Sequence, residues 1–200
     1  MTELKQALDQ INDIRLRVAE AKLFNGFGPL VVGLTGLLAL LLGTFQAMSV
    51  VDGPIMLQAW VLLGAVSFGL IGAEMWALSR RASGANAYTL LWAMIEKFLP
   101  SLFVGAALGW IILIHAPQAH WLLPGIWQVL ISIALFAARP MLPVAVSAVA
   151  AWYMVAGLLG MLIASSGDIT PWSMALPFGV GQLLMALALK WSIPLTTRQV

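Results

Sequence analysis

The sequence predicts an all-α polytopic membrane protein with six transmembrane helices, arranged as three helical hairpins behind an N-terminal amphipathic cytoplasmic helix. Hydrophobic residues make up 62% of the chain and charged residues 9%, whereas a soluble domain is about half apolar and about a quarter charged. Six separate apolar stretches are each long enough to cross a bilayer, which takes about 20 residues. We place the spans at 28–48, 56–79, 99–116, 121–138, 142–164 and 172–192.

The positive charges support this topology because they alternate with the spans. Four of the ten Lys and Arg residues precede the first span, three lie between the second and third, one lies between the fourth and fifth, and two come at or after the end of the sixth. The other three loops contain no Lys or Arg, and their only ionisable side chains are Asp52, His115, His120 and Asp168. Because cytoplasmic loops hold the positive charge of a membrane protein, we expect both termini to be cytoplasmic.

The chain divides into a cytoplasmic segment, 1–25, and a transmembrane domain, 26–200. Apolar residues in the first segment recur in alternating steps of three and four, which predicts a helix with a heptad seam. The seam consists of Leu4, Ala7, Ile11, Ile14, Val18 and Ala21. It packs on the cytoplasmic face of the protein or lies at the lipid interface, or else it docks a cytoplasmic partner or a second copy of the chain.

Prolines suggest a weak internal repeat. Each even span begins with a proline followed four or five residues later by a glutamine, as expected for three equivalent hairpins or for helix capping alone. These pairs are Pro54 and Gln58, Pro124 and Gln128, and Pro177 and Gln182. Residues 82–98 have two interpretations: an interfacial helix, or an extension of the third span that bends at Pro100.

One group of polar and aromatic residues predicts a candidate pocket in the outer half of the bundle. Polar residues within spans usually face the bundle interior, and a buried Trp needs a partner for its indole N–H. The group consists of Gln58, Gln128, Gln182, Trp127, Trp152 and Tyr153. These side chains either line a cavity or hydrogen-bond the helices to one another.

A second candidate site is an ion pair at the cytoplasmic mouth. Glu74 lies near the end of the second span, close in sequence to Arg80 and Arg81. A carboxylate at the bilayer centre costs about 2.5–3.5 kcal/mol on insertion scales, and less near a helix end. Glu74 is therefore either a proton or cation site at the inner mouth, or half of an ion pair that fixes helix register.

Several functions lack the residues they need. The absence of cysteine excludes disulfides and thiolate metal sites. We find no phosphate-binding loop, no nucleophile elbow and no zinc-protease motif, so we do not predict an enzyme. The two histidines, His115 and His120, are loop residues, so we expect neither a metal nor another cofactor. No basic cluster with interleaved aromatic residues indicates nucleic acid as a partner.

Five motifs carry a resemblance to a known family. They are Phe24-Asn25-Gly26-Phe27-Gly28-Pro29 followed by Gly33 and Thr35-Gly36, Glu74-Met75 before Arg80-Arg81, Glu96-Lys97-Phe98-Leu99-Pro100, Leu123-Pro124-Gly125-Ile126-Trp127-Gln128, and Trp172 through Leu176-Pro177-Phe178-Gly179-Val180-Gly181-Gln182. Over nearly its whole length the chain resembles a family of uncharacterised six-span bacterial inner-membrane proteins. The resemblance implies the topology and the bacterial inner membrane, and brings no established activity. The family usually has a basic residue in place of Asn25, which weakens a headgroup contact there.

Three functions fit these observations. The first is a regulatory or scaffold protein that docks a partner or self-associates through its cytoplasmic face. The second is a transporter or channel for a small solute through the pocket of Gln and Trp residues. The third is a lipid or quinone binder that uses the same pocket. Ion-coupled transport is disfavoured because such proteins usually place ionisable residues near the midplane.

Overall fold

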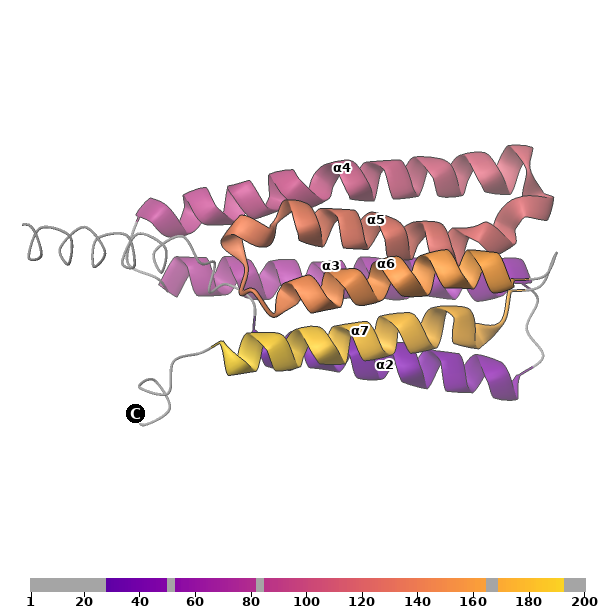
Figure 1. The fold of residues 1–200 in the computed structure, drawn as a ribbon, viewed down its shortest axis with the longest axis horizontal. Helices are drawn as coiled ribbons and strands as arrows, with labels where there is room; N and C mark the ends of the chain where they lie inside the picture. Colours follow the sequence, from indigo (N-terminus) through magenta and orange to yellow (C-terminus); the bar gives the residue numbers. More distant parts are fainter. Residues whose placement is uncertain (1–27, 50–52, 82–84, 165–168, 193–200) are drawn as a thin grey trace, which may run out of the picture.

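The computed structural model describes residues 28–49, 53–81, 85–164 and 169–192. Within these ranges the chain is helical, and six helices are long and apolar enough to cross a membrane. They lie side by side in an elongated bundle (Figure 1). The elements are α2 (Pro29–Met48), α3 (Gly53–Arg81), α4 (Ala85–His115), η1 (Pro117–Leu122), α5 (Leu123–Ala137), η2 (Arg139–Met141), α6 (Val146–Ile163) and α7 (Pro171–Trp191). The all-α, six-span prediction is confirmed; the predicted amphipathic helix and its seam lie outside the described residues.

Prolines begin some of these helices and interrupt others. Pro29 opens α2 and Pro171 opens α7, where the missing N–H costs nothing because the first turn has no helical acceptor for it. Pro100 and Pro177 instead lie inside α4 and α7. The predicted bounds of the last span, 172–192, are close to those of α7, but the expected pattern of a proline at the start of each even span is wrong for Pro177, which lies inside the helix.

Helix α4 resolves the two interpretations of the segment before Pro100. It is a single helix of 31 residues that starts at Ala85 and continues through the proline, so the extension of the third span is confirmed over the described residues. At about 1.5 Å per residue such a helix is about 46 Å long, which exceeds the ~30 Å hydrocarbon core. Helix α4 is therefore longer than a span perpendicular to the membrane requires.

The closest packing does not follow the three predicted hairpins. Helix α2 packs most closely on α7, and α5 on α6, whereas the contacts of α3 with α2 and α4 are sparse. Helices α3 and α4 are also the least buried of the six. The bundle thus has two tightly joined pairs and a looser side formed by α3 and α4.

Glycines explain why the two pairs approach so closely. A Cβ on Gly36 would lie 2.9 Å from the backbone oxygen of Gly179, and a Cβ on Gly157 would lie 2.7 Å from that of Gly125. Such contacts are typical of helices that associate in lipid, where small residues let backbones meet. On α3, by contrast, a Cβ at Gly72 would meet nothing within 4 Å.

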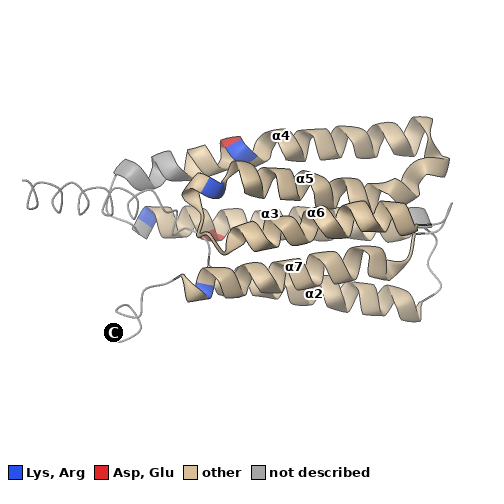
Figure 2. Ribbon diagram, viewed as in Figure 1, with Lys and Arg blue, Asp and Glu red and all other residues tan. Residues whose placement is uncertain are grey.

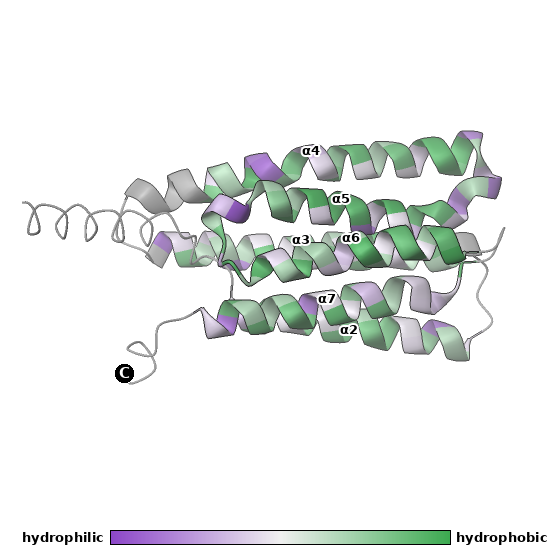
Figure 3. Ribbon diagram, in the orientation of Figure 1, coloured by the Kyte–Doolittle hydropathy of each residue, from purple (hydrophilic) through white to green (hydrophobic). Residues whose placement is uncertain are grey.

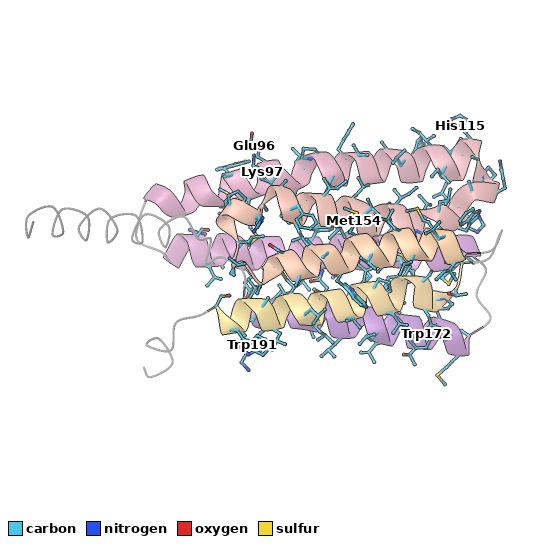
Figure 4. All side chains as sticks on the ribbon, in the orientation of Figure 1. Glu96, Lys97, His115, Met154, Trp172 and Trp191 are labelled. Carbon is cyan, nitrogen blue, oxygen red and sulfur yellow. The ribbon has the colours of Figure 1, made fainter. Side chains whose placement is uncertain are left out.

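Charge and hydropathy distinguish the two ends of the bundle from its sides. The described Lys, Arg, Asp and Glu residues gather toward one end (Figure 2), which we call the basic end; it comprises the C-terminal ends of α3, α5 and α7 and the N-terminal half of α4. His115 lies at the other end of α4 (Figure 4). Hydrophobic residues predominate along all six helices between the ends (Figure 3).

Candidate functional site

Gln128, one of the predicted pocket residues, joins α5 to α7. Its side chain is 1% exposed, and its Nε2 donates a hydrogen bond to the backbone oxygen of Ser173 at 2.8 Å. In a regular helix that oxygen would accept the N–H of residue 177, but Pro177 has none to donate. Gln128 therefore satisfies the carbonyl that the proline leaves without a helical partner.

The two predicted tryptophans also bond to backbone carbonyls of other helices. The indole Nε1 of Trp152 on α6 donates to the oxygen of Pro177 at 3.0 Å, so the α7 proline is held from both α5 and α6. The Nε1 of Trp127 on α5 donates to Gly105 of α4 at 3.1 Å. A Cβ on Gly105 or Gly109 would lie 3.4 Å from the Trp127 ring. These glycines thus provide the surface on which the indole lies.

Gln58 is not part of this group. It is exposed on α3, whereas Gln46, which is not one of the predicted pocket residues, is buried between α2 and α3. The Nε1 of Trp60 donates to Gln46 Oε1 at 2.8 Å, and Gln46 Nε2 donates to the oxygen of Met56 at 3.3 Å. Trp60 could have indicated this contact from the sequence. It lies inside the second predicted span, where its indole N–H needs an acceptor, and Gln46 is near the end of the preceding span.

The two remaining predicted residues, Tyr153 and Gln182, line a cavity of about 260 Å³. Its lining includes Phe68 on α3 and Leu99 on α4, which are exposed, and Val149 on α6, which is buried. Every exposed lining residue belongs to α3 or α4: Phe68, Gly72, Ile95, Leu99 and Leu102. The cavity therefore opens sideways between the two loosely packed helices.

The cavity occupies the half of the bundle toward the basic end, not the predicted outer half. Its lining extends from Tyr153 and Gln182, near the middle of their helices, to Met75 and Met94 near the basic ends of α3 and α4. The prediction placed the pocket by the glutamines and tryptophans nearest the outer loops. Of those residues, Gln128, Trp127 and Trp152 instead donate hydrogen bonds to backbone oxygens of neighbouring helices.

The lining is almost entirely apolar, and its two polar side chains, Tyr153 and Gln182, make no hydrogen bond to the described residues. The Tyr153 side chain is 2% exposed, and its hydroxyl has no hydrogen-bond partner among the described residues. Gln182 is part-buried, and within the described parts of the chain its side chain has no hydrogen bond either. The Tyr153 ring fits because residue 181 is glycine: a Cβ there would lie 2.8 Å from Tyr153 Cε2.

The structure gives Glu74 and Arg80 other partners than each other. The carboxylate of Glu74 accepts a hydrogen bond from the Gly28 backbone N–H, with Oε2 at 3.0 Å, and Gly28 is the N-cap of α2. A negative charge at a helix N-terminus is stabilised by the backbone dipoles. Arg80 lies over the ring of Trp76, with its Cζ 4.8 Å from the centroid, and the Arg81 side chain lies outside the described residues. Glu74 thus attaches α3 to α2.

The bond from Gln128 to α7 provides a test of its structural role. We expect Gln128→Leu to lower the free energy of unfolding by about 1 kcal/mol, because the part-buried Ser173 oxygen loses its donor. In a Pro177→Ala background the alanine N–H supplies that donor, so the same substitution should cost much less. A double-mutant cycle on the four proteins measures the difference. Equal costs in both backgrounds would show that Gln128 does not compensate for the proline.

Two further findings bear on the site. Among the described residues, no three His, Cys, Asp or Glu side chains lie together as metal ligands would. No family model, curated protein or solved structure matches the chain. The cavity between the helices and the chemistry of its lining are therefore the features that indicate a function.

Proposed function

We propose that the protein binds a lipid-soluble ligand in this cavity and takes it from the inner leaflet of the bacterial inner membrane. One observation carries the proposal: an apolar cavity whose buried walls belong mainly to the closely packed helices and whose exposed lining belongs to α3 and α4. A ligand dissolved in the bilayer would reach such a cavity from the side without passing through water. The outer faces of α3 and α4 are where lipid would lie.

The size and lining of the cavity fit this role. Ligand pockets span about 300–1,000 Å³ and are mostly apolar with a few polar groups. A cavity of about 260 Å³ would hold one end of a ligand while the rest stays in lipid. Met75, Met94 and Met185 all contribute to the lining. Methionine side chains are flexible and polarizable, which allows the walls to adapt to different shapes.

The positions of the Lys and Arg residues support the choice of the inner leaflet. The cavity lies toward the basic end, and positive residues mark the cytoplasmic side of a membrane protein. We therefore place the opening in the inner leaflet, where anionic headgroups would meet Arg80 and Lys97; both side chains are exposed. With this orientation, we propose that both termini are cytoplasmic.

The geometry favours binding over transport or catalysis. Among the described lining residues none is charged, and only Tyr153 and Gln182 carry polar side-chain atoms. An opening on the side of the bundle suits exchange with the bilayer more than passage of a solute from end to end. A regulatory role through residues 1–25 is compatible with a bound ligand and stays a prediction.

A bulky side chain at the opening should prevent binding. Gly72 lines the cavity, and a Cβ there meets nothing within 4 Å, so Gly72→Phe would extend into the space without disturbing the backbone. In proteoliposomes we expect an alkane that carries a photoreactive diazirine to label α3 and α4 at the lining, and excess unlabelled alkane to compete. Gly72→Phe should lower this competed labelling by about tenfold, which corresponds to about 1.4 kcal/mol.

Gly69 offers a matched control on the same helix. A Cβ at Gly69 also meets nothing within 4 Å, but Gly69 is not a lining residue. Gly69→Phe adds the same ring to α3 and should leave the competed labelling unchanged. If both variants label like the original protein, or if no labelling is competed, the cavity is not a binding site for apolar ligands.

A further inference from the structure

We infer that the ligand is an uncharged molecule with a carbonyl group at its buried end, and that the carbonyl oxygen accepts hydrogen bonds from Tyr153 and Gln182. This inference rests on the proposed function and specifies its ligand. Tyr153 and Gln182 are the polar members of the described lining. Neither side chain has a hydrogen-bond partner among the described residues, so their donors remain available.

The depth of this pair in the bundle excludes a charged headgroup. Tyr153 follows the first residue of α6, Val146, by about two helical turns, a rise of about 10 Å. Gln182 lies at the middle of α7, which runs from Pro171 to Trp191. Both are therefore near the midplane of their spans. A phosphate there would be costly to bury, and the described lining offers no cation to pair with it.

The chemistry of the two side chains favours an acceptor. A tyrosine hydroxyl donates one hydrogen bond, and a glutamine amide donates two. A buried polar group without a partner is destabilising, so an acceptor brought to the Tyr153 hydroxyl would remove an existing penalty. A carbonyl oxygen has two lone pairs and can accept from both residues. Ketones and quinones are carbonyl compounds that dissolve in lipid and carry no charge.

The surrounding side chains fix where the carbonyl would lie. The Tyr153 ring is 5.7 Å from that of Phe178, centroid to centroid, and it lies against Gly181 on the other helix. The ring therefore has little freedom to turn away from the cavity. Gln182 follows Gly181 directly, so the donors of α6 and α7 lie at neighbouring positions along the contact between these two helices.

Two photoreactive probes of equal length test the inference, one an alkane and the other a methyl ketone, both with a diazirine in the chain. We expect the ketone to label the lining of the original protein about three- to tenfold more than the alkane, as one or two hydrogen bonds would give. Tyr153→Phe and Gln182→Leu should each reduce ketone labelling toward the alkane level and leave alkane labelling unchanged. Tyr153→Phe should not lower the thermal midpoint, since the hydroxyl it removes has no partner.

The outcomes separate the inference from the proposed function. Equal labelling by the two probes, or a ketone preference that survives both substitutions, would overturn the carbonyl contact while binding in the cavity stands. Absence of competed labelling by either probe would overturn both. If Gln182→Leu proves unstable, Tyr153→Phe decides alone, because it keeps the ring that packs against Gly181.

Discussion

Gly157→Ala should lower the free energy of unfolding by about 1–3 kcal/mol, the usual cost of overpacking. The added methyl would lie 2.7 Å from the backbone oxygen of Gly125 and 2.9 Å from Val129 Cγ2. A side chain could turn away, but a backbone oxygen in a helix cannot, so α5 and α6 must separate. Since this pair is one of the two closest in the bundle, we expect the loss to be global.

Gly160 provides the control, one helical turn further along α6. A Cβ there meets nothing within 4 Å, and replacing glycine by alanine inside a helix otherwise stabilises it by about 0.5–1 kcal/mol. Gly160→Ala should therefore be neutral or slightly stabilising in the same detergent. Unfolding curves of the three proteins measure the difference. Similar midpoints for the two variants would mean that the helices do not meet at Gly157.

Glu74→Ala should cost about 1–2 kcal/mol and loosen the basic end of α3. The substitution removes a charge-assisted hydrogen bond to the Gly28 N–H and a favourable charge at the start of α2. Because α3 otherwise makes few contacts with α2, little remains to hold the two helices together there. Glu74→Gln keeps an acceptor and should have a smaller effect.

The separation of α2 and α3 can be measured directly because the chain has no cysteine. Spin labels at Leu30→Cys and Ala77→Cys would report it, since both positions are exposed. We expect Glu74→Ala to broaden the distance distribution between the labels. Glu96→Ala removes an exposed carboxylate on α4 and should leave it unchanged. An unaltered distribution in Glu74→Ala would show that other contacts hold α3 in place.

Hydropathy and the position of charge were enough to predict the spans, because lipid requires long apolar helices and the basic residues alternate with them. The same pattern could not distinguish a proline that starts a helix from one inside it. Pro29 and Pro177 precede similar apolar stretches, but only Pro29 opens a helix. The difference lies in the partner helices, where Gln128 and Trp152 bond to carbonyls around Pro177.

The candidate pocket was predicted only in part for a related reason. A sequence shows which span residues are polar but not which helix each one faces. Gln128 and Gln46 are buried against backbone carbonyls, whereas Gln58 is exposed. Of the six predicted pocket residues, Tyr153 and Gln182 are the two that line the cavity. To select these two residues, one must know that α6 packs on α7. The positions of the glycines do not show this packing, because a glycine does not indicate which helix it faces: Gly157 of α6 faces α5, whereas Gly181 of α7 faces α6.

The pairing of α2 with α7 has a consequence for biosynthesis. Four transmembrane helices separate this pair along the chain, and membrane insertion proceeds from the N-terminus. The glycine face of α2 therefore stays without its partner until translation has passed α7. A ribosome that stalls before Pro171 would release a product with this face uncovered. We expect a membrane protease to degrade such an incomplete chain. Degradation of truncated products should therefore depend on whether α7 has been made.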